Sequence, residues 1–288
     1  MRVTIHLLTK DRPSELAMCL NSLYTQTFKN WDLILVDSGS TPVITYKFIN
    51  DIIQRIRLSG HWVKYINKMG WCDIGKLRNI AIEEDIFNRT CLRIDDDSIA
   101  DSEYLDRLVQ CYIHYSGYKE GQVAEKLVAV GGVVPPCGSP KIYMPIPESG
   151  IFNEIKFDLD GNITYIADDG GYTYDPFLQG MCSVALPSHH LRSSFIFPNP
   201  TFDKRVPLYP EEYGQTGYRE ETDWCIAFAY AGGKMYTVTD AICWHAHGRS
   251  GGARIPNYQE IAQINDIHFR EKIKRWYQER GNPFENKK

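Results

Sequence analysis

The sequence has 288 residues, of which 43% are hydrophobic and 24% charged, and its formal net charge is −4. This composition is typical of a globular protein with a sizeable core. The weak negative charge argues against general nucleic-acid binding, which usually requires a basic surface. No apolar run approaches the roughly 20 residues that span a bilayer, so we expect no transmembrane segment, while peripheral membrane contact stays open.

The eight cysteines include no Cys-x-x-Cys pair, and most lie in apolar runs. This pattern favours buried, reduced thiols, as in cytoplasmic proteins. The first eight residues predict a strand rather than a signal peptide, because their apolar part is too short for one. We therefore expect a cytoplasmic protein.

Apolar strands and helical faces alternate through the first 134 residues. Strands are predicted at 3–8, 31–36, 62–66, 90–94 and 127–134. Helices are predicted between them; Leu16, Leu20 and Leu23, for example, fall on one helical face. This alternation predicts a doubly wound α/β sheet, in which ligands bind at the carboxyl ends of the strands.

Beyond residue 134 the chain becomes rich in Pro, Gly, Tyr and Asp. We expect short antiparallel strands and long loops there, with a hairpin turn at 160–162. A helix is predicted at 220–231, where Trp224, Ala227 and Phe228 share one face. Two short strands follow at 235–238 and 241–244, and a closing helix is predicted at 258–280.

Three consecutive carboxylates, Asp95, Asp96 and Asp97, follow the predicted strand at 90–94. Adjacent negative charges repel one another, and their natural partner is a hard divalent cation with oxygen ligands. A cation held by one or two of these carboxylates keeps coordination sites for substrate phosphates. The alternative interpretation is a solvated acidic turn that caps the next helix.

Further motifs lie in order around this triplet. They are Thr9-x-x-Arg12-Pro13, the segment 34–40 with Asp37, Gly70 followed by Lys76-Leu77-Arg78-Asn79, Gly180, Glu220-Glu221-x-Asp223-Trp224, and His245. Together with Asp95-x-Asp97 they resemble the family-2 glycosyltransferases with the GT-A fold. The resemblance implies one GT-A catalytic domain at 1–255 and a C-terminal helical extension at 256–288. Within that domain, a Rossmann-like nucleotide-sugar-binding half at 1–134 precedes a loop-rich acceptor and catalytic half at 135–255.

The resemblance also implies a donor site for a nucleotide-diphosphate sugar. Its residues are expected to be Thr9, Arg12, Asp37, Arg78, Asp95, Asp96, Arg249 and Ser250. Asp37 could instead form a turn before Ser38-Gly39, and Asp96 could face away from the donor as a structural residue. The loop with Arg249 and Ser250 could offer N–H groups and a guanidinium to the diphosphate, or could simply be a mobile surface loop.

Asp97 and His245 are the expected metal ligands. A carboxylate, an imidazole and phosphate oxygens favour Mn²⁺ or Mg²⁺ over zinc. His247 lies two residues beyond His245 and would point to the other side of an extended chain. We therefore expect only one of them to meet the cation, with His245 preferred by position and a structural role as the alternative for each.

An inverting transfer needs a carboxylate that accepts the proton of the acceptor hydroxyl. The resemblance places this base at Glu221, where the family usually has Asp, so Glu220 and Asp223 stay open as alternatives. A helix N-terminus favours ionised carboxylates, but acidic residues also commonly decorate such positions without further function. Gly180 and Trp224 are expected on the acceptor side.

The predicted function is metal-dependent, inverting transfer of a sugar from a nucleotide-diphosphate donor to a hydroxyl acceptor. A UDP-sugar is the commonest donor that the resemblance implies. The alternatives are a retaining transferase on the same fold, a nucleotidyltransferase that releases pyrophosphate, and a catalytically silent sugar- or nucleotide-binding protein. The sequence does not identify the sugar, the base, the acceptor or the oligomeric state.

Overall fold

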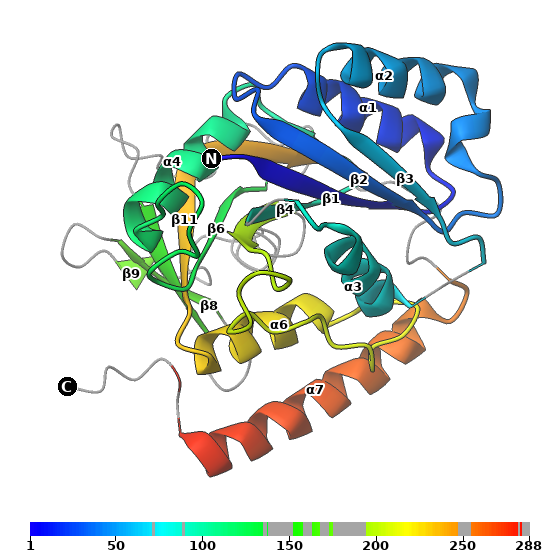
Figure 1. Cartoon of the computed structure of the whole chain (residues 1–288). Coiled ribbons are helices and arrows are strands. Elements are labelled where there is room, and N and C mark those ends of the chain that lie inside the picture. Colours follow the sequence, from blue (N-terminus) through cyan, green and yellow to red (C-terminus); the bar gives the residue numbers. More distant parts are fainter. Residues whose placement is uncertain are drawn as a thin grey trace.

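A large mixed sheet with helices on both faces makes up the protein in the computed structural model (Figure 1). The structure describes residues 1–70, 73–87, 90–134, 137, 152–157, 163–167, 173–174, 194–246, 255–281 and 283. The strands are β1 (Val3–Thr9), β2 (Trp31–Asp37), β3 (Val63–Asn67), β4 (Thr90–Asp95), β5 (Ser98–Ala100), β6 (Val128–Val133), β7 (Phe152–Phe157), β8 (Ile163–Ala167), β9 (Thr173–Tyr174), β10 (Ser194–Pro198) and β11 (Lys234–His245). The helices are α1 (Pro13–Tyr24), η1 (Val43–Thr45, a 3₁₀ turn), α2 (Lys47–Leu58), α3 (Ile74–Glu84), α4 (Tyr104–Ser116), α6 (Glu220–Tyr230) and α7 (Tyr258–Arg280).

The strand order is β3-β2-β1-β4-β10-β6-β11-β7-β8-β9, and β5 pairs with β11 beside this path. Strands β3, β2, β1 and β4 are parallel, as expected for a doubly wound half. Strand β10 then enters antiparallel to both β4 and β6, whereas β11 runs parallel to β6. The predicted α/β sheet is therefore confirmed, and it is mixed because antiparallel pairs follow its parallel part.

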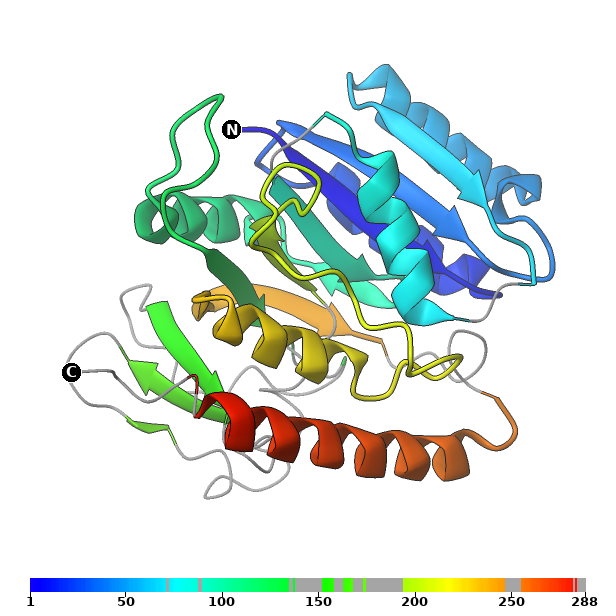
Figure 2. The same ribbon diagram turned by 60° about the horizontal axis from the view of Figure 1, so that its bottom comes forward.

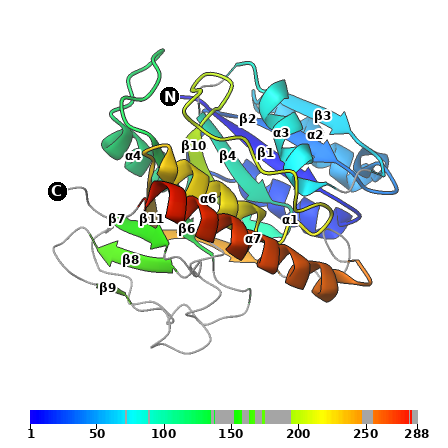
Figure 3. The same ribbon diagram turned by 90° about the horizontal axis from the view of Figure 1, so that it is seen from below.

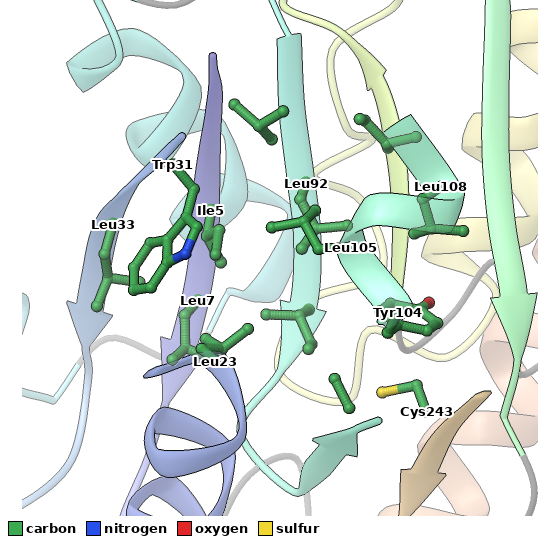
Figure 4. Close-up of a cluster of buried hydrophobic side chains, with 14 of the residues drawn as sticks. Ile5, Leu7, Leu23, Trp31, Leu33, Leu92, Tyr104, Leu105, Leu108 and Cys243 are labelled. Atoms are coloured by element: carbon green, nitrogen blue, oxygen red, sulfur yellow. The ribbon is translucent and has the colours of Figure 1, made fainter. Parts of the chain in front are cut away.

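Helices α1, α2 and α4 cover one face of the sheet. Alternate residues of β1, such as Ile5 and Leu7, point toward these helices and are fully buried (Figure 4). Leu23 of α1 and Leu105 of α4 meet the same layer. Because every second residue of a strand faces the same side, this apolar layer leaves the polar residues of β1 on the other face.

Helices α3 and α6 cover the opposite face, and α7 lies alongside α6 (Figures 2 and 3). Phe269 and Ile273 of α7 are buried in the same apolar cluster as Trp224 and Phe228 of α6. The helix predicted at 258–280 is thus confirmed and packs onto α6. None of the helices in the described part of the chain combines the length and apolar character that crossing a membrane requires.

Gly75 in the first turn of α3 lies against the backbone of the segment 209–211. A Cβ at this position would come 2.1 Å from the carbonyl oxygen of Pro210. Asn79, one turn later, donates to the carbonyl oxygen of Tyr209 over 2.9 Å and accepts from its N–H over 2.9 Å. The missing side chain at Gly75 therefore lets α3 approach this segment closely.

Replacing Gly75 with Ala is expected to lower the free energy of unfolding by about 1–3 kcal/mol, because the added methyl group forces backbone apart at a tight contact. Urea unfolding followed by circular dichroism measures this change. Glu83→Ala, at an exposed position of the same helix, is the matched control and should lie close to the wild type. Equal stability of the two variants would contradict the close approach.

Three strands differ from the sequence prediction. The segments predicted at 235–238 and 241–244 are one strand, β11, with a register shift between Val238 and Ile242 in its pairing with β6. Strands β5 and β10 were not predicted. Strands β7 and β8 pair antiparallel, as expected on either side of the turn at 160–162, and that turn itself lies outside the described residues.

Candidate active site

Three strands deliver polar residues to the same edge of the sheet. The register pairs Thr9 with Asp37 and Leu8 with Asp95, so β1, β2 and β4 end side by side. Asp37 is buried and accepts hydrogen bonds from the N–H groups of Gly39 (2.9 Å) and Val43 (2.7 Å). The Asp37 carboxylate thus forms the turn that was the alternative prediction for this residue. The turn lies at the strand ends, where nucleotides bind in open α/β sheets.

Asp96 is buried among donors of the protein itself. Its carboxylate accepts from the hydroxyl of Thr9 (2.8 Å) and from Nη1 of Arg12 (3.1 Å). Burial raises the pKa of Asp96 to about 7, although Arg12 favours the charged form. These contacts fit the structural role for Asp96, in which it anchors the aspartate turn to β1 and α1.

Asp97 and His245 lie together although they are far apart in the sequence. The short strand β5 pairs antiparallel with the end of β11 and sets Ser98 opposite His245. As a result, Oδ1 of Asp97 lies 3.3 Å from Nε2 of His245, and both side chains are largely buried. The other carboxylate oxygen of Asp97 accepts from Arg12 over 3.1 Å.

This pair fits a divalent cation. Ligand atoms lie about 2.0–2.2 Å from Mg²⁺ or a similar ion, so two ligands of one ion are commonly separated by only slightly less than the observed 3.3 Å. One carboxylate and one imidazole leave most coordination positions to other groups, such as phosphate oxygens. His247, the alternative ligand, lies outside the described residues.

Five charged residues form a second cluster beside this pair, which we term the charge ring: Arg78, Arg93, Asp95, Glu220 and Glu221. Arg78 lies 3.2 Å from both Asp95 and Glu220. Arg93 lies 2.8 Å from Glu221, 3.7 Å from Asp95 and 3.8 Å from Glu220. Arg78, Asp95, Arg93 and Glu220 therefore alternate in charge around a closed ring, and Glu221 joins it through Arg93. The cluster connects β4, α3 and the start of α6.

The two glutamates of the charge ring differ in their surroundings. Glu220 is fully buried, whereas the side chain of Glu221 keeps 14% of its surface exposed. Burial raises the pKa of Glu220 to about 7, although Arg78 and Arg93 favour its charged form. Glu220 thus has the environment of an internal counter-ion to the two arginines. Glu221 is exposed enough for a substrate to reach it.

The structure separates Asp223 and Trp224 from the charge ring. Asp223 faces α7, where it accepts from the hydroxyl of Tyr213 (2.6 Å) and pairs with Lys272 (2.6 Å). Trp224 has no exposed surface; it stacks with Tyr209 and donates from Nε1 to the carbonyl oxygen of Pro207. The acceptor-side prediction for Trp224 is corrected accordingly, because a side chain enclosed by the core cannot contact an acceptor.

Sequence reasoning missed Arg93, the most central residue of the charge ring. A usable signal was present, since a charged residue inside the apolar segment 90–94 must find a partner when the strand is buried. Its partners Glu220 and Glu221 could not be named, because they lie on a helix much later in the chain. Of the other predicted site residues, Gly180, Arg249 and Ser250 lie outside the described residues.

One further group with metal-ligand chemistry lies deeper in the described part of the protein. Ligand atoms of His6, Asp85 and Cys91 fall within 4.8 Å of one another, and all three residues are buried. Asp85 accepts a hydrogen bond from the hydroxyl of Thr4 (3.0 Å), and Nε2 of His6 lies 3.1 Å from its second oxygen. These contacts account for the group as a polar network within the core.

Comparison with known proteins agrees with this geometry. Residues 4–115 match the model of the family named Glycosyl transferase family 2. The structure of S. aureus TarS 1–349 in complex with UDP-GlcNAc aligns with a TM-score of 0.59 at 12% identity, over 96% of this chain and 73% of that chain. The structure of GalNAc-T7 with UDP, GalNAc and Mn²⁺ aligns with a TM-score of 0.58 at 12% identity, over 97% of this chain and 56% of that chain. No curated protein sequence matches the chain.

The fold is therefore that of the GT-A glycosyltransferases. The match to the family model covers the part of the chain from β1 to α4. The chain spans 60% of the length of one TarS 1–349 chain and 43% of a longer TarS chain.

Proposed function

We propose that this protein is a glycosyltransferase, which transfers a sugar from a nucleotide-diphosphate donor, with a UDP-sugar favoured, to a hydroxyl acceptor with inversion at the anomeric carbon. The observation that carries the proposal is the approach of Asp97 and His245 to 3.3 Å beside the charge ring, at the carboxyl ends of the strands. A cation site and a reachable carboxylate are the two parts that such a transfer needs. The UDP-GlcNAc bound in a TarS structure supports this choice of donor.

The donor nucleotide is assigned to the edge formed by β1, β2 and β4. Asp37 and Asp95 stand at two of these strand ends, and Arg78 holds Asp95 in place over 3.2 Å. Thr9 and Arg12 keep the aspartate turn closed through their contacts with Asp96. Arg249 and Ser250 stay predicted contacts of the diphosphate.

Asp97 and His245 would hold Mn²⁺ or Mg²⁺, in line with the Mn²⁺ present in the GalNAc-T7 structure. When bound, the ion supplies positive charge to the leaving diphosphate. The position of Arg12 between Asp96 and Asp97 fixes one carboxylate oxygen of each. Asp97 is therefore already oriented for binding before any ligand arrives.

Glu221 is the proposed general base, and its exposed fraction of 14% distinguishes it from the fully buried Glu220. Glu221 takes the proton of the acceptor hydroxyl as that oxygen bonds to the anomeric carbon. The bond from this carbon to the diphosphate oxygen breaks in the same step. The nucleoside diphosphate leaves with the electron pair, and the anomeric configuration inverts.

A thermal-shift panel of nucleotide-sugars tests donor binding. UDP-sugars are expected to raise the melting temperature more with Mn²⁺ than without it, since the cation joins the protein to the diphosphate. A ligand at 100 times its Kd stabilises the folded protein by about 2.7 kcal/mol, which a melting curve resolves readily. If no nucleoside diphosphate or nucleotide-sugar stabilises the protein, the proposed function fails.

Product analysis separates the alternatives. A nucleotidyltransferase would release pyrophosphate from a nucleoside triphosphate, whereas the proposed reaction releases a nucleoside diphosphate. The coupling constant of the anomeric proton in the product distinguishes inversion from retention. A silent binding protein would show the thermal shift but no turnover with any acceptor.

A further inference from the structure

The charge ring contains one residue whose role the proposed function leaves open, the buried Arg93. We infer that Arg93 is a positioning residue, which orients the Glu221 carboxylate and stabilises its ionised form. This inference rests on the proposed function, because it concerns the base of that reaction. It goes further by assigning the residue that prepares the base.

Arg93 lies in the middle of β4 and is 1% exposed. Its guanidinium makes its shortest contact with Glu221, from Nη2 to Oε1 over 2.8 Å, whereas Glu220 and Asp95 lie 3.8 Å and 3.7 Å away. Charge-assisted hydrogen bonds have about this shorter length. Among the three carboxylates around it, Arg93 is thus bound most directly to the proposed base.

The surroundings of Arg93 keep it charged and immobile. Burial opposes its charge, yet Glu220, Glu221 and Asp95 together raise the pKa of Arg93 above its ordinary value. The guanidinium also lies 5.7 Å from the ring centres of Phe195 and Tyr209. Because aromatic faces attract guanidinium groups, these two rings hold the side chain under α6 and fix the direction from which it meets Glu221.

Glu220 balances this arrangement. Two guanidinium groups face three carboxylates in the charge ring, so the ionised ring carries one excess negative charge. Glu220 and Asp95 each contact both Arg78 and Arg93, and Glu220 is the fully buried one of the two. Its negative charge stabilises both guanidinium groups inside the protein. Arg78 also contacts Asp95, and Arg93 also contacts Glu221.

Glu221 faces titratable and charged groups on several elements. Arg93 of β4 forms an ion pair with it, and Glu220 and Cys225 of α6 lie within electrostatic range. Asp95, Arg78 and Tyr209 surround Glu220 and Arg93 rather than Glu221 itself. Arg93 is the cation in direct contact with Glu221 within this described group. Its removal should therefore make Glu221 harder to ionise than in the wild type.

The test compares the pH dependence of kcat/KM in the wild type, Arg93→Met and Arg93→Lys, with the best nucleotide-sugar and acceptor from the panels above. Arg93→Met should lower kcat about 100-fold or more, the usual scale for disturbing a general base. Its acidic limb should move to higher pH, while the thermal shift given by the donor should stay close to that of the wild type. Arg93→Lys retains the charge and should restore part of kcat.

Leu92→Ala is the matched control. Leu92 is the buried neighbour of Arg93 on β4, and its side chain points to the opposite face of the sheet. Its truncation should destabilise the protein by about 2–5 kcal/mol without moving the acidic limb. If Arg93→Met does not fold, Arg93→Lys decides, because loss of the two-pronged guanidinium should still lower kcat.

An unchanged kcat and acidic limb in the folded Arg93 variants would overturn the inference. So would equal losses of kcat in Arg93→Met and Leu92→Ala with no shift of the limb in either. Failure of the proposed function looks different, since the wild type itself would then bind no nucleotide-sugar and form no product.

Discussion

Glu221→Gln is expected to lower kcat by about 10² to 10⁴, the range that general base catalysis supplies. The amide keeps the size of the side chain but cannot take the proton of the acceptor hydroxyl. Donor binding should survive, because Glu221 lies on α6 and the donor is assigned to the ends of β1, β2 and β4. Single-turnover formation of product, measured beside the donor thermal shift, checks both parts.

Two companion variants sharpen this result. Glu221→Asp should retain more activity than Glu221→Gln, because it keeps a carboxylate of the kind that related enzymes are expected to carry. Asp223→Asn should mainly affect stability, since Asp223 is buried and pairs with Lys272 of α7. Near-normal turnover in Glu221→Gln together with an inactive Asp223→Asn would instead identify Asp223 as the base.

Asp97→Asn and His245→Ala are expected to lower kcat/KM by about 10² to 10³, which corresponds to the several kcal/mol that a bound cation supplies. Both should also raise the Mn²⁺ concentration needed for half-maximal activity. Asn can still accept from Arg12, so the fold around Asp97 should persist. Mn²⁺ titrations of activity, and of free Mn²⁺ by electron paramagnetic resonance, measure the two effects.

His268→Ala is the control for His245→Ala, because His268 is a half-exposed histidine of α7. It should leave the Mn²⁺ dependence unchanged. If His245→Ala also leaves that dependence unchanged, His245 is not a ligand, and the same titration of His247→Ala then tests the alternative. If Asp97→Asn also leaves the Mn²⁺ dependence unchanged, the proposed cation site itself is wrong.

The elements that the sequence predicted well are those whose signals are local. The strands β1, β2 and β4 come from continuous apolar runs, and α6 from the common face of Trp224 and Phe228. Strand β10 was missed because its apolar core is short, ends at Pro198 and lies between loop-like segments. The error at Trp224 arose from reading it as part of a motif, although the same helical face already predicted its burial.

In the site, too, local motifs could be predicted from the sequence and contacts between distant residues could not. The aspartate triplet and the Glu220-Glu221 pair were visible as sequence motifs, whereas the contact between Arg93 and Glu221 depends on packing α6 against β4. No spacing along the chain encodes such a contact. The pairing of β5 with β11 was equally invisible, because a strand of three residues gives no periodicity.

This pairing of β5 with β11 has a consequence for how the enzyme is made. During synthesis the ribosome completes β1 to β4, with Asp97, long before His245 emerges. The proposed cation site therefore forms only when β11 docks onto the sheet. Contacts between residues so distant in the chain form late and slowly in folding. A nucleotide-sugar with Mn²⁺ should therefore bind only chains in which β11 has docked. The rate at which binding appears during refolding would then report the rate of this final step.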